Sequence, residues 1–168
     1  MTLESKSTDV IVEYDRWNEI EFSDIAETAT KAVFKYLDLG PSRYSVAILA
    51  CDDSKISSLN SSFRGKANPT NVLSWPAFEL AAGEYPDAMW DDEPIELGDV
   101  AIAFETCLRE AQEQGKQMEH HVTHLLIHGV LHLFGYDHEE DSEAELMEAK
   151  ETAILATLGI ADPYILKD

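Results

Sequence analysis

Residues 128–138 read His-Gly-Val-Leu-His-Leu-Phe-Gly-Tyr-Asp-His, with histidines at offsets of four and ten residues. Positions four apart lie one above the other on a helix, so His128 and His132 can bind one ion together. Gly135 can take the left-handed conformation that ends a helix and turns the chain back, which would return His138 toward them. Three neutral imidazoles with an open fourth position are typical of a catalytic zinc site. The stretch therefore predicts a metal-bearing helix and an enzyme.

The alternative is a histidine-rich helix that binds no metal. A single histidine pair four residues apart arises often by chance, but three histidines with a glycine at the turn favour a metal site. The chain has only two cysteines, Cys51 and Cys107, too few for a disulfide framework. Either could serve as a ligand, but we expect both to be buried thiols.

The length and composition of the chain predict one soluble domain. It has 168 residues, of which 45% are hydrophobic, and we expect a single domain over 1–168 with a flexible start at 1–7. No apolar stretch approaches the roughly 18–20 residues that span a bilayer. The start lacks the pattern of a secretory signal. We therefore expect a cytoplasmic protein without membrane contact.

The charge argues against a general nucleic-acid binder. The chain carries 33 acidic and 12 basic residues, a net charge of −21, whereas proteins that hold RNA through its phosphates normally carry a basic patch. Acidic residues crowd into 91–96 and 139–148, while Arg64 and Lys66 share one short loop. We interpret the acidic runs as solvated faces in preference to a docking surface for a basic protein.

The apolar periodicity predicts an α+β fold, a small mixed sheet of about four strands packed with four or five helices, one of them the zincin-like metal-bearing helix. Alternation favours strands, and stripes at helical spacing, with Gly and Pro at their ends, favour helices. We expect strands at 10–14, 45–51, 72–75 and 98–104, helices at 23–39, 52–63, 105–114, 118–134 and 143–158, and a long exposed loop at 81–96.

The histidine offsets also match the metzincin proteases, whose signature is His-Glu-x-x-His-x-x-Gly-x-x-His. Those proteases use the glutamate as general base, but this chain has Gly129 there, which has no side chain to move a proton. A peptidase with this standard machinery is therefore disfavoured. A helical glycine costs about 0.8–1.0 kcal/mol relative to alanine. Its presence indicates close approach of substrate or backbone, or tight packing, and the sequence does not choose between them.

Further sequence blocks lie before and after the histidine stretch. In chain order they are Leu59-Asn60, Phe63-Arg64-Gly65-Lys66, Pro69 to Pro76, Gly98-Asp99-Val100 and the tail from Glu140 to Tyr164. Together they resemble the YbeY family of metal-dependent endoribonucleases, the rRNA maturation factors, over roughly residues 20–164. The departures are Trp75 in place of the usual phenylalanine, Asn71 where many members have aspartate, and a long acidic loop before Gly98.

The resemblance implies a zinc-dependent, single-strand-specific endoribonuclease in 16S rRNA 3′-end maturation and ribosome quality control. It implies one zinc ion per chain, held by His128, His132 and His138, with Arg64 as a further catalytic residue. A guanidinium is suited to bidentate contact with phosphate and to charge developing at phosphorus. Lys66 can assist. Either zinc-bound hydroxide or the 2′-hydroxyl of the RNA can be the nucleophile, and the sequence leaves both open.

Other residues are candidates for the surroundings of the site. Thr70, Asn71 and Ser74 line the cleft if the family match holds. His124 lies a turn before His128, and it either orients a ligand, shuttles a proton or is an ordinary buried polar residue. Asp137 either accepts a ring N–H from a ligand imidazole, as metal-bound histidines usually require, or serves the turn alone. We expect His120 and His121 to be exposed.

Two rival functions remain beside the ribonuclease. One is a metallopeptidase that takes its base from outside the signature. The other is a non-catalytic ribosome-assembly factor whose metal only stabilises the fold. Under the ribonuclease hypothesis, a small basic cleft near Arg64 binds RNA weakly, and ribosomal small-subunit or assembly proteins bind the acidic surface and supply specificity.

Overall fold

A computed structural model of the chain describes residues 7–40, 43–65, 69–86 and 94–164, except for the side chains of Phe63 and Arg64. Strands and helices alternate through the first half of these residues, and helices follow in the second half. The elements are β1 (Thr8–Val12), the 3-10 helix η1 (Asp15–Ile20), α1 (Phe22–Tyr36), β2 (Tyr44–Cys51), α2 (Asp53–Arg64), β3 (Val72–Pro76), β4 (Ile95–Ala103), α3 (Phe104–Gln114), α4 (Met118–Leu133) and α5 (Asp141–Thr157).

The four strands form one mixed sheet in the order β1-β2-β4-β3. β1, β2 and β4 are parallel, while β3 runs antiparallel to β4 at the edge, with Ser74 opposite Val100. Alternate residues of β2 are buried, as expected of a strand with one face on a large core. The predicted α+β fold with a small mixed sheet is confirmed.

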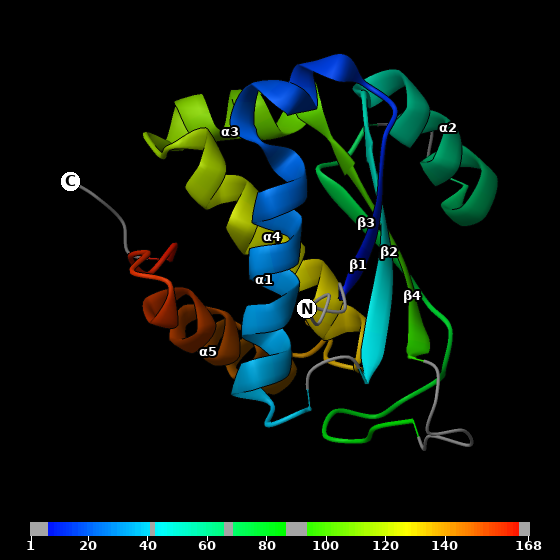
Figure 1. Cartoon of the computed structure of the whole chain (residues 1–168), viewed down its shortest axis with the longest axis vertical. Coiled ribbons are helices and arrows are strands. Elements are labelled where there is room, and N and C mark those ends of the chain that lie inside the picture. The colour runs from blue at the N-terminus through cyan, green and yellow to red at the C-terminus, as the bar shows by residue number, and fades with distance from the viewer. Residues whose placement is uncertain (1–6, 41–42, 66–68, 87–93, 165–168) are drawn as a thin grey trace, which may run out of the picture.

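The helices cover the two faces of the sheet unequally. Figure 1 shows the sheet nearly edge-on, with α1, α4 and α5 on one side and α2 on the other. The larger core lies on the first side, where Trp17, Phe22 and Phe104 form a cluster of tilted and edge-to-face rings. A smaller core, which includes Cys51 and Ile56, lies on the side of α2. Both faces of the sheet are therefore covered by apolar cores.

Helix α4 is the central helix and is buried along most of its length. It packs against the sheet so closely that a Cβ atom added to Gly129 would lie 3.1 Å from Val100 Cγ1 and 3.2 Å from Ser74 Oγ. The Ser74 hydroxyl also donates to the Gly129 carbonyl at 3.0 Å. Tight packing on the sheet, one of the two explanations left open by the sequence, accounts for glycine at this position.

The boundaries differ from the sequence-based ones in a few places. β4 begins at Ile95 instead of residue 98, because its first residues extend the pairing with β2 beyond the apolar run, and the acidic loop is correspondingly shorter. η1 was not predicted, since six residues with one buried side chain, Trp17, give no periodic signal. Residues 1–6 of the expected flexible start lie outside the described residues, but Ser7 is buried and its N–H donates to Glu27.

None of the described helices is long and apolar enough to cross a bilayer. Both cysteines are buried free thiols, as expected. Burial raises the pKa of Cys51 to about 12, and burial likewise raises the pKa of Cys107 well above its ordinary value. The two thiols are therefore protonated and inert at neutral pH.

Candidate metal centre and groove

The three histidines of the quoted stretch converge on one point. Ligand atoms of His128, His132 and His138 all lie within 4.8 Å of one another, and within the residues that the structure describes they form the one such group. The ring centroids are 4.5 Å apart for His128 and His132, and 5.5 and 5.2 Å from His138 to these two. The first two rings are half-buried on α4, and His138 is exposed on the loop after it.

The turn that returns His138 depends on Gly135. This glycine has a φ of +91°, and a Cβ atom there would lie 2.2 Å from the backbone oxygen of Leu80. Both its left-handed conformation and its contact with the loop after β3 exclude a side chain. The chain therefore turns back after α4, as the sequence predicted from the glycine, and residues 135–138 contact the loop after β3, which the sequence did not predict.

The orientation of the two α4 rings fits a metal ion. Their Nε2 atoms face each other at 3.0 Å, while tetrahedral zinc with nitrogen ligands at 2.0–2.1 Å separates those ligands by about 3.3 Å. The His132 Nδ1–H donates to the Tyr136 carbonyl at 2.8 Å, and the His128 Nδ1–H faces Glu151 Oε1 at 3.3 Å. With Nδ1 engaged by the protein, Nε2 is the lone-pair nitrogen in both rings, which is the tautomer a metal ligand needs.

The environment of His132 keeps this ring neutral. Burial, together with the neighbouring His128 and His138, lowers the pKa of His132 to about 4 against the opposing hydrogen bond to Tyr136. A neutral imidazole is the form that binds a metal. The residues present therefore fit a three-histidine metal centre.

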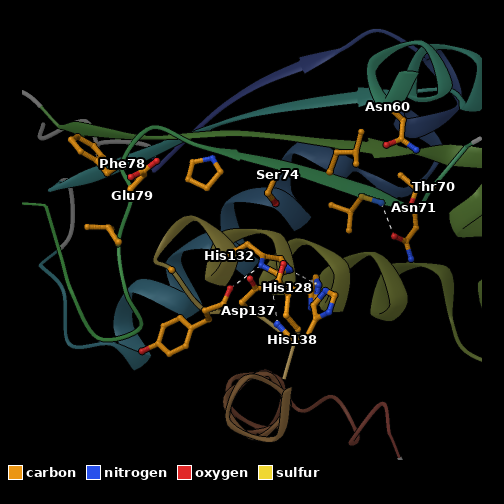
Figure 2. Close-up of a pocket in the computed structure, with 17 residues that line it drawn as sticks. Asn60, Thr70, Asn71, Ser74, Phe78, Glu79, His128, His132, Asp137 and His138 are labelled. Carbon is orange, nitrogen blue, oxygen red and sulfur yellow. Dashed lines mark hydrogen bonds between the residues drawn. The ribbon is translucent and has the colours of Figure 1, made fainter. Parts of the chain in front are cut away.

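A groove of about 880 Å³ lies over this centre, between β3 and α4. Figure 2 shows the three histidines in the middle of the groove, with Asn60, Thr70 and Asn71 toward one end and Phe78 and Glu79 toward the other. The edge strand β3 supplies one wall with Val72, Leu73 and Ser74. The predicted residues Thr70, Asn71 and Ser74 are thus brought to the same groove as the histidines.

Two of these three residues also hold the wall together. The Asn71 amide donates to the Glu110 carboxylate at 3.0 Å, and its Oδ1 accepts the Val72 N–H at 2.7 Å. Ser74 is tied to the backbone of α4 at Gly129. These contacts fix the start of β3 and its distance from the helix.

Arg64 is the last residue of α2, which ends near the groove. The backbone of Arg64 is one helical turn beyond Asn60, which lines the groove, and Gly65 ends the helix with a φ of +69°. The side chain of Arg64 and the whole of Lys66 lie outside the described residues, so their assigned roles stay predictions.

Sequence reasoning missed Glu151 of α5. Its Oε1 accepts hydrogen bonds from His124 Nε2 at 2.6 Å, from the Tyr164 hydroxyl at 2.8 Å and from His128 Nδ1 at 3.3 Å. Burial alone would raise its pKa, but the hydrogen bonds from His124 and His128 outweigh burial and lower the pKa to about 2. A glutamate one helix further along the chain leaves no local pattern that would link it to His128.

One expectation about the surroundings is wrong, and the sequence left two roles open for Asp137. His121 is 4% exposed, not exposed as predicted, because its Nε2–H donates to Glu110 at 2.9 Å inside a second cavity between α3, α4 and α5. His120 is exposed as expected. The Asp137 carboxylate accepts the His138 backbone N–H at 2.8 Å, which is the turn role, while the Tyr136 carbonyl receives the His132 ring proton.

Comparisons with known proteins agree with this geometry. The pattern of the family described as Endoribonuclease YbeY matches residues 7–159. The Endoribonuclease YbeY of Jannaschia sp. (strain CCS1) is 49% identical over 158 residues, which cover 93% of this chain and 98% of that protein. The Endoribonuclease YbeY of Cereibacter sphaeroides is 50% identical over 162 residues, with coverages of 93% and 97%.

A solved structure shares the fold. The solution structure of TM1509 from Thermotoga maritima superposes with a TM-score of 0.56 at 22% identity, covering 90% of this chain and 91% of that one. The sequence matches extend over almost the entire length of the relatives, and the family pattern includes both α4 and β3. This chain therefore belongs to the YbeY family of endoribonucleases.

Proposed function

We propose that the chain is a zinc-dependent endoribonuclease that cuts single-stranded RNA in the groove above His128, His132 and His138. Its proposed cellular role is in 16S rRNA 3′-end maturation and ribosome quality control, in the cytoplasm. The observation that carries the proposal is the groove with three converging imidazoles in a chain of this family. The matched relatives are themselves named endoribonucleases.

Zinc is the metal that the donor set fits best. Imidazole nitrogen is a usual zinc ligand, and three protein ligands leave a position for substrate. We expect one ion per chain, with His128 and His132 binding through Nε2 because their Nδ1 atoms face protein acceptors. A zinc ion held there would supply a Lewis acid that polarises a phosphoryl oxygen.

The proposed RNA contacts lie along the groove. Thr70, Asn71 and Ser74 on the β3 side offer polar groups, and Arg64 is proposed to hold a phosphate and stabilise negative charge at phosphorus. Lys66 is proposed to assist. His124 contacts Glu151 and not the groove, so we assign it a supporting role.

With a net charge of −21 and only 12 basic residues in the chain, we expect few phosphate contacts. Exposed acidic side chains gather on the loop before α5 and on its first turns, with Glu139, Glu140, Asp141, Glu143 and Glu145 exposed. Basic ribosomal or assembly proteins of the small subunit are the proposed partners of this surface, since charge complementarity guides association.

The test compares cleavage of a single-stranded RNA by the native chain, by Arg64→Ala and by Arg109→Ala, with zinc content and folding checked in each. Arg109 is an exposed arginine of α3 and serves as the matched control. Arg64→Ala is expected to retain zinc and to lose about 100-fold or more in rate, as does removal of a donor that stabilises transition-state charge. The control is expected to keep the native rate.

The alternatives give different results in the same assay. A full rate in Arg64→Ala would show that its assigned role is wrong. Cleavage of peptides but not of RNA would establish a metallopeptidase. Purified native protein that cuts nothing, yet restores ribosome assembly in cells lacking it, would establish a non-catalytic assembly factor.

A further inference from the structure

Behind the metal centre, a carboxylate from another helix contacts one of the three histidines. Glu151 lies on α5, 23 residues beyond His128, and is fully buried. Figure 2 shows α5 nearly end-on below the three histidines, on the side away from β3. The groove and this carboxylate thus lie on opposite sides of the His128 ring. Nε2 faces His132 on the groove side, and Nδ1 faces Glu151.

The hydrogen bonds at Glu151 all end on one oxygen. Oε1 receives donors from His124, Tyr164 and His128, while Oε2 is buried without a partner in the described part of the chain. An oxygen that receives three donors belongs to an ionised carboxylate. No lysine or arginine is paired with Glu151 among the described contacts, so these three donors compensate its burial.

The geometry points to Glu151 as a positioning residue for the metal centre: its carboxylate holds the His128 Nδ1–H, so that Nε2 faces the ion. This inference rests on the proposed metal site. His124 and Tyr164 fix the carboxylate in turn, and Tyr164 brings the tail after α5 into the same cluster. A carboxylate behind a ligand imidazole fixes the ring orientation and increases its basicity.

The two α4 ligands would then be oriented by different devices. His132 is held by a backbone carbonyl of its own loop, at Tyr136, so no side-chain substitution removes the acceptor atom itself. His128 is held by the side chain of Glu151, which substitution can remove. Only the support of His128 is therefore open to a direct mutational test.

The experiment measures zinc affinity by chelator competition for the native chain, Glu151→Gln, Glu151→Met and Glu145→Gln. Loss of a carboxylate behind a metal ligand typically lowers metal affinity by about 10–100-fold. We expect that loss in Glu151→Met, which has no acceptor. A smaller loss is expected in Glu151→Gln, which keeps an acceptor oxygen without the charge. Glu145→Gln removes the same charge from an exposed position of α5 and is expected to bind zinc as the native chain does.

Thermal unfolding of the metal-free proteins separates positioning from a structural role. The inference is supported if zinc affinity is highest in the native chain, lower in Glu151→Gln and lowest in Glu151→Met, which has no acceptor at this position. This holds even if Glu151→Met unfolds at a lower temperature. Native affinity in Glu151→Gln and in any folded Glu151→Met, or an equal loss in Glu145→Gln, would overturn it. Failure of the native chain to bind zinc would overturn the proposed function as well, so the two failures are distinguishable.

Discussion

The two halves of α4 are both rich in histidine but use it differently. The first half carries His120, His121 and His124, and the second carries His128 and His132, with His138 just beyond its end. In the first half, Nε2 of His121 and of His124 contacts a carboxylate, of Glu110 and Glu151 respectively. In the second half, Nδ1 contacts the protein and Nε2 faces the neighbouring ring.

This difference shows that the number of histidines on a helix does not decide where a metal binds. A ring whose Nε2 lone pair faces the same point as the neighbouring rings can bind a metal. A ring whose Nε2 contacts a carboxylate instead supports the fold. Nδ1 of His121 and of His124 is buried without a partner in the described residues, out of reach of the groove. Which ring nitrogen contacts the protein therefore decides whether a histidine of α4 can bind the metal.

The largest expected effect comes from comparing two variants, each with one histidine of α4 replaced by alanine, one in each half of the helix. His128→Ala is expected to lose RNA cleavage by at least about 100-fold and to lose zinc, because changes behind a metal ligand alone cost 10–100-fold. His121→Ala is expected to keep about one zinc per chain and to lose about 1–3 kcal/mol of stability, since it removes a buried side chain and its hydrogen bond to the partly exposed Glu110 carboxylate. Zinc content, RNA cleavage and urea unfolding of both variants measure this. Equal zinc loss in both would remove the distinction between the halves.

A second expected difference between the halves is packing. Gly129→Glu restores the residue that metzincins use as a base, but its side chain would begin 3.1 Å from Val100 and 3.2 Å from Ser74. We expect it to destabilise the chain by about 1–3 kcal/mol, as overpacking does, and to create no peptidase activity. Glu119→Gln, at an exposed position of the first half, is the control and should unfold as the native chain does. A stable Gly129→Glu variant that cleaves peptides would contradict the packing argument.

The smallest expected effect is a pH dependence that belongs to the first half. Burial lowers the pKa of His121 below its ordinary value, against the opposing hydrogen bond and charge of Glu110. The unfolded chain therefore binds this proton more readily, so the stability from neutral His121 is complete above the unfolded pKa of about 6.5. It declines as pH falls below that value toward the folded pKa.

His121→Gln removes this titration while keeping a polar side chain. Urea unfolding of the metal-free proteins at pH 7.5 and pH 5.5 should show a smaller loss of stability at the lower pH in the variant than in the native chain. All titratable groups other than residue 121 are the same in both proteins, so their contributions cancel in the difference. If the native chain and His121→Gln lose the same stability between pH 7.5 and pH 5.5, His121 does not titrate in this range.

The features that local spacing determines were predictable from the sequence. The helix with His128 and His132, the turn at Gly135 and the return of His138 follow from the helical repeat and from the conformational freedom of glycine, and the structure confirms all three. The burial of His121 and the role of Glu151 were not predictable. Both depend on carboxylates of other helices, which pair with α4 only once the chain has folded.

Contacts made by backbone atoms could not be predicted from the sequence either. The Tyr136 carbonyl that orients His132 is present in any sequence, so no residue type marks it, and the sequence offered this role only as one of two alternatives for Asp137. The choice between close packing and substrate approach at Gly129 likewise required the position of the sheet. Side-chain spacing thus indicates which residues can meet, and tertiary structure decides which atoms do.

The most direct test of the metal centre is X-ray absorption at the zinc edge on the zinc-loaded native chain, with metal content measured on the same sample. We predict about one zinc per chain, with nitrogen ligands at about 2.0–2.1 Å and no sulfur neighbour. Absence of retained zinc after reconstitution, or a zinc–sulfur distance of about 2.3 Å, would contradict a centre built from His128, His132 and His138.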